Sequence, residues 1–174
     1  DYPVIDGIKT LDHAYTQGFF TGDGTYGNKT NEKERPCRFK ALERKSYCKR
    51  HLKYQKNDET SINCQGISYT KKPRVTLYAE KMKLLEHLDY DSYGEVKDNK
   101  LNVTLNVNLK DKFFVPLEGY DIKSKLEWFS GYADADGCIS NNQGNCSLQI
   151  VSIEKDFLIN VKLMLQTCGI NTKI

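Results

Sequence analysis

The chain has 174 residues and a formal net charge of +3, which suits one domain or two small domains with ample material for a core. It contains no run of 18 apolar residues and no basic-then-apolar amino terminus, so we expect no membrane span and no secretory signal. Six cysteines without a secretory context favour reduced thiols or metal ligands in an intracellular protein, of the cytoplasm or the nucleus.

The first predicted element is a helix that begins at Thr10, its N-cap, and runs to Gly22. Gly18 and Gly22 lie four positions apart and give this helix one smooth edge. Asp23 and Gly24 follow, which places an acid at the negative end of the helix dipole, unfavourable by about 0.3–1 kcal/mol. An acid in this unfavourable position indicates a function. The alternative is that it is a hydrated loop residue beside an ordinary glycine cap.

A basic block follows between Lys29 and Lys56, where eleven Lys/Arg stand against three Glu, a local charge of +8. Such a block attracts phosphate backbones, although a solvated loop can also carry it for no purpose. The candidate phosphate contacts in it are Arg44, Lys45, Lys49 and Arg50.

The basic region also contains three cysteines and a histidine with the spacing C-x10-C-x2-H-x12-C, namely Cys37, Cys48, His51 and Cys64. Three thiolates and an imidazole suit a structural zinc ion, and the tight Cys48–His51 pair can bind one ion from a single turn. Because the spacing fits no standard zinc finger, four unconnected residues remain the alternative.

The next stretch is predicted to form a strand at residues 74–79 and a helix at 80–88. A hairpin follows, with strands at 93–96 and 101–108 and a turn at 97–100. In the last strand, apolar residues alternate with an amide-rich face. That face can sit in water, but on a strand in a major groove Asn pairs with adenine. The candidate DNA contacts on these strands are Arg74, Thr76, Asn102, Thr104, Asn106 and Asn108.

Residues 116–123 read as a linker, and Ser124 with Glu127 opens a second helix with a capping box. This helix repeats the features of the first, with Gly131 and Ala135 four positions apart and an acid before a glycine, Asp136. If the two smooth edges pack together, Asp23 and Asp136 meet at one end, where they would repel unless a divalent cation lay between them. The elements predicted after it are strands at 138–141 and 147–152, a helix at 154–168 and the start of a strand at 170–174.

The two halves share a register. From the motif acid to the Glu-Lys pair that opens the next helix there are 57 positions between Asp23 and Glu80 but 18 between Asp136 and Glu154, so the first half carries 39 extra residues. These residues include the cysteines and the histidine, which favours one small module over a long structureless loop. In the same register the second half stops at Ile174, before its fourth strand and final helix.

The two acid-glycine segments are FSGYADADG at 129–137 and TQGFFTGDG at 16–24, and they resemble the two motif copies of LAGLIDADG homing endonucleases, the second closely and the first loosely. The resemblance implies an α+β fold of two pseudo-symmetric halves packed through the motif helices. It implies that Asp23 and Asp136 are catalytic and hold Mg²⁺, with Gly22 and Ala135 as further ligands. It also implies double-stranded DNA as the partner.

We therefore predict a first half at residues 1–115 with a zinc-binding insertion at about 31–69, the linker, and an incomplete second half at 124–174. The linker resembles, more weakly, that of endonuclease domains inside inteins, which implies a flanking splicing domain and host protein segments. The predicted activity is site-specific double-strand cleavage by metal-assisted hydrolysis, with this fragment alone poorly active.

Two other functions are compatible with the sequence. One is a non-cleaving nucleic-acid binder, such as an RNA maturase or a decayed endonuclease, although a binder needs neither motif acid. The other is a zinc-stabilised protein-interaction domain, favoured if the basic block does not bind nucleic acid.

Overall fold

The structure is a computed structural model, and it describes residues 3–25, 73–105, 108–142 and 144–174. The chain divides into two units, residues 1–26 with 72–174 and residues 27–71, and all described residues belong to the first. The elements are α1 (Ala14–Asp23), β1 (Gly24–Thr25), β2 (Arg74–Tyr78), η3 (Ala79–His87), β3 (Tyr90–Tyr93), β4 (Lys100–Leu105), α2 (Ile122–Asp136), β5 (Gly137–Asn142), β6 (Asn145–Ile150) and α3 (Lys155–Thr167). Within the described ranges, no helix is long and apolar enough to span a membrane.

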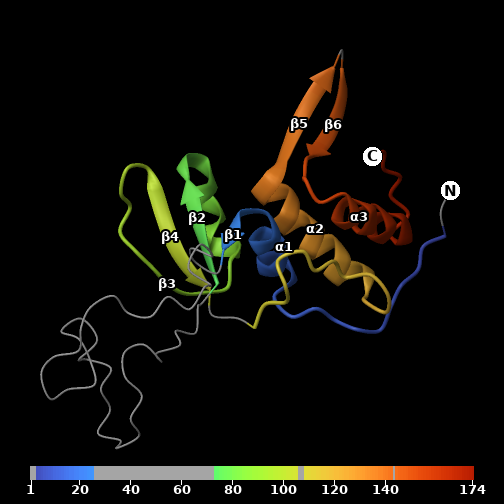
Figure 1. Cartoon of the computed structure of the whole chain (residues 1–174), viewed down its shortest axis with the longest axis horizontal. Helices are drawn as coiled ribbons and strands as arrows, with labels where there is room; N and C mark the ends of the chain where they lie inside the picture. The colour runs from blue at the N-terminus through green and yellow to red at the C-terminus, as the bar shows by residue number, and fades with distance from the viewer. Residues whose placement is uncertain (1–2, 26–72, 106–107, 143) are drawn as a thin grey trace, which may run out of the picture. The chain divides into compact units, whose positions relative to one another are not determined.

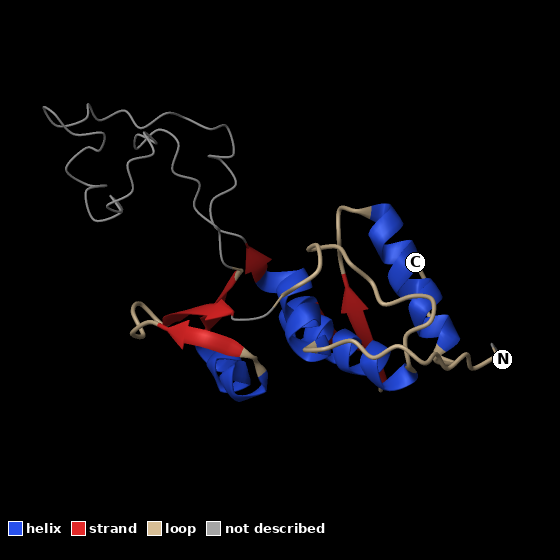
Figure 2. Cartoon of the chain, turned by 90° about the horizontal axis from the view of Figure 1, so that it is seen from below, coloured by secondary structure: helices blue, strands red, loops and turns tan. Residues whose placement is uncertain are grey.

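Four strands form an antiparallel sheet in the order β1-β2-β4-β3. The predicted alternation of apolar and polar residues holds, since Val75, Leu77, Leu101, Val103 and Leu105 are all buried on one face. Figure 2 shows η3 against this sheet, and its Met82, Leu84 and Leu85 pack on the same core. Among the described residues, the sheet is therefore covered on one face and open on the other.

The strands β5 and β6 form a separate antiparallel hairpin, which is followed by α3. The apolar residues of α3 face α2, and together they make a second core of Trp128, Tyr132, Phe157, Val161, Met164 and Leu165. Figure 1 shows α1 and α2 side by side, with the four-stranded sheet and the β5–β6 hairpin following their ends. Each motif helix contributes to both cores, because Phe19 and Ala135 belong to the first and Ala14 and Trp128 to the second.

The predicted α+β class with antiparallel strands is confirmed, and the order helix, strand, strand, helix occurs twice. The helix that follows β1 and β2 differs from the prediction. This element, η3, is a 3₁₀-helix, and it ends with a hydrogen bond from Leu88 N to the carbonyl of Leu85, three residues back. The turn at 97–100 is confirmed, with Asp98 and Asn99 both in the left-handed region, at φ 49° and 58°, as a tight hairpin turn requires.

Both motif helices begin at residues other than those predicted. Lys9 pairs with the linker, donating to Gly119 and accepting from Asp121, and α1 starts later than the predicted Thr10. It begins after His13, whose φ is 55°. The second motif helix, α2, starts at Ile122, inside the predicted linker at 116–123.

The capping box predicted for α2 is also wrong. Asp121 is the N-cap, and its Oδ1 accepts a 2.7 Å hydrogen bond from Ser124 N. The hydroxyl of Ser124 instead accepts a 2.8 Å bond from Leu11 N, which fastens the segment before α1 to the start of α2. This bond lowers the cost of burying the Ser124 side chain.

Two strand predictions need correction. The first strand of the hairpin is β3 at 90–93 rather than 93–96, and its register against β4 shifts between Tyr90 and Ser92, as at a β-bulge. Residues 170–174 are not a strand. There Ile170 N bonds the carbonyl of Leu165, as at the end of a helix, and in the described ranges β6 pairs with β5 alone.

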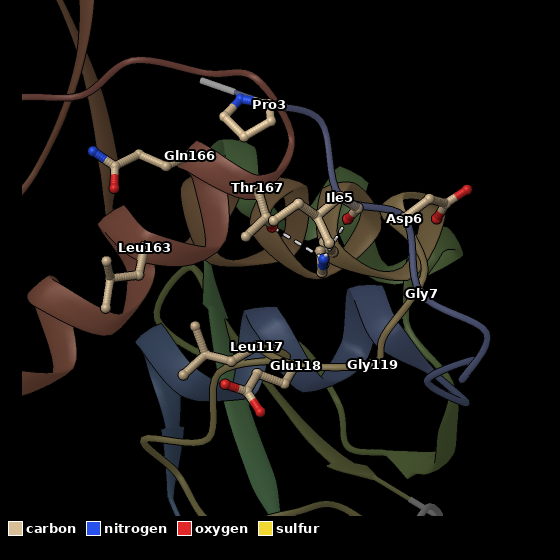
Figure 3. Close-up of a pocket in the computed structure, with 11 residues that line it drawn as sticks. Pro3, Ile5, Asp6, Gly7, Leu117, Glu118, Gly119, Leu163, Gln166 and Thr167 are labelled. Carbon is tan, nitrogen blue, oxygen red and sulfur yellow. Dashed lines mark hydrogen bonds between the residues drawn. The ribbon is translucent and has the colours of Figure 1, made fainter. Parts of the chain in front are cut away.

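A buried lysine fastens the amino-terminal segment to the second core. Lys125 is 1% exposed, and its Nζ donates to the carbonyl of Ile5 at 3.2 Å and to Thr167 Oγ1 at 3.0 Å. These residues line a cavity of about 610 Å³, which has the carboxyl-terminal end of α3 on one side and Leu117 on the other (Figure 3). The cavity shares no lining residue with the acidic ends of the motif helices.

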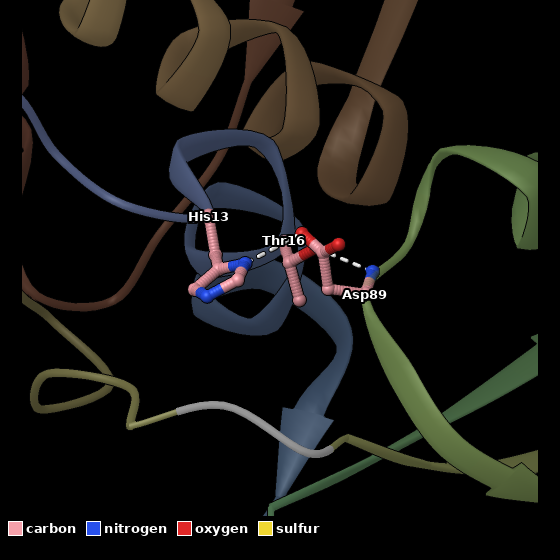
Figure 4. Close-up of polar contacts among 3 residues, drawn as sticks. All are labelled: His13, Thr16 and Asp89. Atoms are coloured by element: carbon pink, nitrogen blue, oxygen red, sulfur yellow. Dashed lines mark hydrogen bonds and ion pairs between the residues drawn. The ribbon is translucent and has the colours of Figure 1, made fainter.

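Asp89 fastens the chain between η3 and β3 to the first turn of α1 (Figure 4). Its backbone N–H donates to Thr16 Oγ1 at 2.9 Å, and its Oδ2 lies 2.9 Å from His13 Nδ1. Thr16 itself is fully buried, so this bond satisfies a hydroxyl that would otherwise be costly to bury.

Candidate active site

The motif helices touch through the small residues that the sequence places four apart. A Cβ added at Gly18 would overlap the carbonyl oxygen of Trp128, and one added at Gly131 would overlap the carbonyl oxygen of Tyr15. Because backbone lies in the way, no side chain can move aside to make room. The close approach of the two helices, predicted from the sequence, is confirmed.

The contact continues to the carboxyl ends of the helices. A Cβ at Gly22 would lie 2.5 Å from Ala135 Cβ and 3.1 Å from Asp136 Cγ. Asp136 therefore packs over Gly22, the residue before Asp23. The two acids are the last helical residues of α1 and α2, as the sequence predicted.

The glycines after the acids are not left-handed caps. Gly24 and Gly137 are extended, with φ −80° and −78°, and each N–H still bonds a helical carbonyl, of Phe20 and Ala133. A Cβ at either position would overlap that same carbonyl oxygen. The ordinary glycine cap is thus the wrong explanation, and glycine is needed here because the chain turns directly from helix into strand.

The two carboxylates are close enough to affect one another. The pKa of Asp136 is raised from its ordinary value of 3.8, first by burial and then by the negative charge of Asp23. The positive charges of Lys81 and Lys112 act in the opposite direction. The ends of the motif helices therefore hold two acids and two lysines in one electrostatic neighbourhood.

Lys81, from η3, joins the two helix ends directly. Its Nζ lies 2.6 Å from Asp23 Oδ2 and 2.5 Å from the carbonyl oxygen of Ala135. Both charged side chains are partly buried, with 36% of Lys81 and 26% of Asp23 exposed. One ammonium group thus binds a carboxylate from α1 and a carbonyl from α2.

Lys112 approaches from the chain between β4 and α2. Its Nζ donates a 2.8 Å hydrogen bond to the carbonyl of Gly24, the residue after Asp23. Sequence reasoning found neither lysine, because each reaches the site from a distant segment. The Glu-Lys pair at 80–81 marked the repeat, but its counterpart Lys155 is exposed at the start of α3.

The open face of the four-stranded sheet carries four of the predicted DNA contacts. Antiparallel register places Arg74 opposite Thr104 and Thr76 opposite Asn102. Thr76 Oγ1 donates to Asn102 Oδ1 at 2.9 Å, so one side of that amide is already held in place. Asn108 is exposed beyond the end of β4, and Asn106 lies outside the described residues.

Residues 123–174 match the sequence model of the LAGLIDADG-like domain. Residues 123–174 therefore belong to a LAGLIDADG-like domain. The match contains the second motif copy and the elements after it, whereas the first copy, in α1, lies outside it. Close packing of α1 on α2 is the observation that ties the first copy to the matched domain.

The chain is also similar to a much longer protein, the ribonucleoside-diphosphate reductase large subunit of Invertebrate iridescent virus 6. The two are 32% identical over 178 residues, an alignment that covers 100% of this chain and 14% of the viral protein. The chain therefore spans about one seventh of that relative. No solved structure matches the chain.

The ends of α1 and α2 bring several oxygen atoms close together. Mg²⁺ prefers oxygen ligands, and Asp23 Oδ2 and the Ala135 carbonyl already share one cationic partner, Lys81 Nζ. Asp136 and Gly22 lie beside them. Among the described residues no group of three or more His, Cys, Asp or Glu could hold a metal, so carbonyl oxygens would have to complete any site here.

The predicted zinc ligands and basic contacts lie outside the described residues; they are Cys37, Cys48, His51, Cys64, Arg44, Lys45, Lys49 and Arg50. Within the described ranges, Cys138, Cys146 and Cys168 are free thiols.

Proposed function

We propose that this chain is the DNA-binding and catalytic part of a site-specific homing endonuclease, which makes double-strand breaks by hydrolysing phosphodiester bonds. The observation that supports this function best is the meeting of Asp23 and Asp136 at the ends of two tightly packed motif helices, beside two lysines. The match of residues 123–174 to a LAGLIDADG-like domain supports the same class of activity.

In this proposal, Asp23 and Asp136 would hold Mg²⁺ with the backbone oxygens of Gly22 and Ala135. When bound, the metal would supply an activated water and neutralise charge on the leaving oxygen. The protein's part is to fix these oxygens, and it does so through backbone packing that leaves the helix ends little freedom.

The two lysines would assist at the phosphate. A scissile phosphate carries negative charge that grows during attack, and an ammonium group beside it stabilises that charge. Lys81 and Lys112 lie at the acid pair and are partly exposed, so each can reach a phosphate placed there.

The open face of the sheet would bind the duplex. Its side chains, Arg74, Thr76, Asn102 and Thr104, suit a major groove because they offer donors and acceptors from neighbouring strands. The buried face opposite holds these strands in place. The basic block would add phosphate contacts, on a module ordered by Zn²⁺ at Cys37, Cys48, His51 and Cys64.

The similarity to a viral reductase subunit supports an intein as the setting. The name of that relative describes no nuclease, and the aligned part is 14% of its length. An endonuclease carried inside a host protein fits both facts. Its partners would then be a flanking splicing domain and the host segments.

A cleavage assay on a library of DNA duplexes with Mg²⁺ tests the function. The protein should be the chain in its longer natural context, and the readout should be linear products with one consensus site. Binding to one duplex without scission at any Mg²⁺ concentration would instead favour the non-cleaving binder.

A further inference from the structure

The Nζ atom of Lys81 lies where a cation bound to both motif helices would lie. Its Nζ contacts two oxygens, Asp23 Oδ2 at 2.6 Å and the Ala135 carbonyl, and these come from different helices. Both belong to the oxygen set that the proposed function assigns to Mg²⁺. The proposed metal site is thus occupied by a positively charged group that the protein itself supplies, the Lys81 ammonium.

We propose that Lys81 is a built-in competitor of the divalent metal, so that metal binds this site only after Lys81 has left it. The inference rests on the proposed function, because it concerns loading of the same acid pair. It goes beyond that function by assigning Lys81 a role before any DNA is cleaved.

The distances require this competition. Mg²⁺ binds oxygen at about 2.0–2.1 Å, so a metal sharing either oxygen with Lys81 Nζ would lie no more than about 5 Å from that nitrogen. The double positive charge of the metal and the single charge of the ammonium group repel strongly at this distance, because Lys81 and Asp23 are both partly buried. The ammonium and the metal therefore exclude one another.

The Lys81 side chain can also leave the site for solvent. Lys81 lies on η3, its side chain is 36% exposed, and its nitrogen is carried on a flexible stem of four carbon atoms. Release into solvent costs its two hydrogen bonds, and the metal replaces the lost positive charge. Until then the Lys81 ammonium group pairs with the negative charge of the Asp23 carboxylate.

The test measures metal affinity without DNA or activity. Mn²⁺ is titrated into the 174-residue chain and its Lys81→Met, Lys81→Gln and Lys81→Arg variants, and free Mn²⁺ is followed by electron paramagnetic resonance. We expect Lys81→Met and Lys81→Gln to bind Mn²⁺ on the order of fivefold tighter, the size expected for a partly exposed ion pair, and Lys81→Arg to stay near wild type.

Lys83→Met is the matched control, because Lys83 lies on the same helix but pairs with Glu80 in solvent. It should bind Mn²⁺ as wild type does. Adding Asp23→Asn to Lys81→Met should remove the gain, which would place the extra affinity at this carboxylate. Lys81→Gln keeps a donor for Ala135 and carries the test if methionine impairs folding.

The outcomes separate the inference from the proposed function. Equal Mn²⁺ affinity in all folded variants, lost on Asp23→Asn, would overturn the competition but leave the acid pair as the metal site. Binding of no Mn²⁺ by any variant, or binding unaffected by Asp23→Asn, would overturn the metal site itself and the competition with it.

Discussion

Gly131 lies against the carbonyl oxygen of Tyr15, and a Cβ there would overlap that oxygen. Alanine is normally the better helix residue by about 1 kcal/mol, so a glycine at this position indicates that helix contact outweighs helix propensity. We predict that Gly131→Ala destabilises the fold by about 1–3 kcal/mol, the usual cost of overpacking. Urea unfolding followed by circular dichroism measures it.

Gly94→Ala is the control for this experiment. Gly94 has Asn102 O as its nearest neighbour, at 3.9 Å from an added Cβ, and its φ is not positive. Its substitution should cost little. Equal effects at the two glycines would mean that the seam between α1 and α2 is looser than its geometry indicates.

The acid pair should be needed for scission but not for DNA affinity. We predict that Asp23→Asn or Asp136→Asn, in the chain with its natural flanking sequence, abolishes cleavage and keeps duplex affinity within a few-fold, because a metal carboxylate serves the chemistry. Asp134→Asn is the control, since Asp134 is exposed and accepts a bond from Tyr15 instead. Wild-type cleavage by either motif variant would remove these acids from the active site.

Sequence patterns predicted those features that depend on neighbours in the chain. The motif glycines and acids recur at fixed spacing, and the alternation in β2 and β4 reports which face is buried. The small residues then required the helices to touch. From that contact alone the pairing of Asp23 with Asp136 follows.

Features set by distant contacts could not be predicted in this way. Lys81 is 58 residues from Asp23 and 54 from Ala135, so no local pattern connects them. The N-cap of α2 shows the same limit. Asp121 and Ser124 are both good caps, and Ser124 is taken by Leu11 N, 113 residues away.

The Asp121 cap should make stability depend on pH. The hydrogen bonds to Ser124 lower the pKa of Asp121 below its ordinary 3.8, so the carboxylate contributes stability above that pH and loses it as the pH falls through the lowered value. We predict that Asp121→Ala destabilises the fold at neutral pH and that its difference from wild type shrinks below pH 3.8. Thermal melts across pH measure this.

Asp121→Asn separates the hydrogen bond from the charge. Asn caps helices about as well as Asp but does not titrate, so this variant should stay near wild type at neutral pH and show no loss at acid pH from this position. A constant difference between Asp121→Ala and wild type at every pH would contradict the assignment of the cap.

The basic region should carry zinc. We predict about one Zn²⁺ per chain in protein purified without chelators, because three thiolates and an imidazole match a structural site. Metal analysis decides it, and Cys64→Ser should lower the content. Neutralising Arg44, Lys45, Lys49 and Arg50 should then flatten the salt dependence of DNA binding. Zinc-free protein that keeps full DNA affinity would contradict both statements.

The β5–β6 hairpin should be the softest part of the described sheets. In the first sheet β2 is paired on both sides, by β1 and β4, whereas in the described ranges β6 pairs with β5 alone. Two-stranded hairpins are marginal in water, and here Ile139 is 73% exposed and Leu148 44%. We predict that amides of β5 and β6 exchange with solvent at least about tenfold faster than those of β2 and β4, as expected of a locally opening unit.

A soft hairpin has a consequence for catalysis, because β5 begins at Gly137, the residue directly after Asp136. Motion of β5 displaces one of the two acids, and small displacements cost much in rate. We therefore expect these 174 residues alone to cleave DNA poorly, and a longer natural chain that slows amide exchange in β6 to cleave better. Strong, specific cleavage by the 174-residue monomer, with β6 still exchanging fast, would show that Asp136 does not need a rigid strand after it.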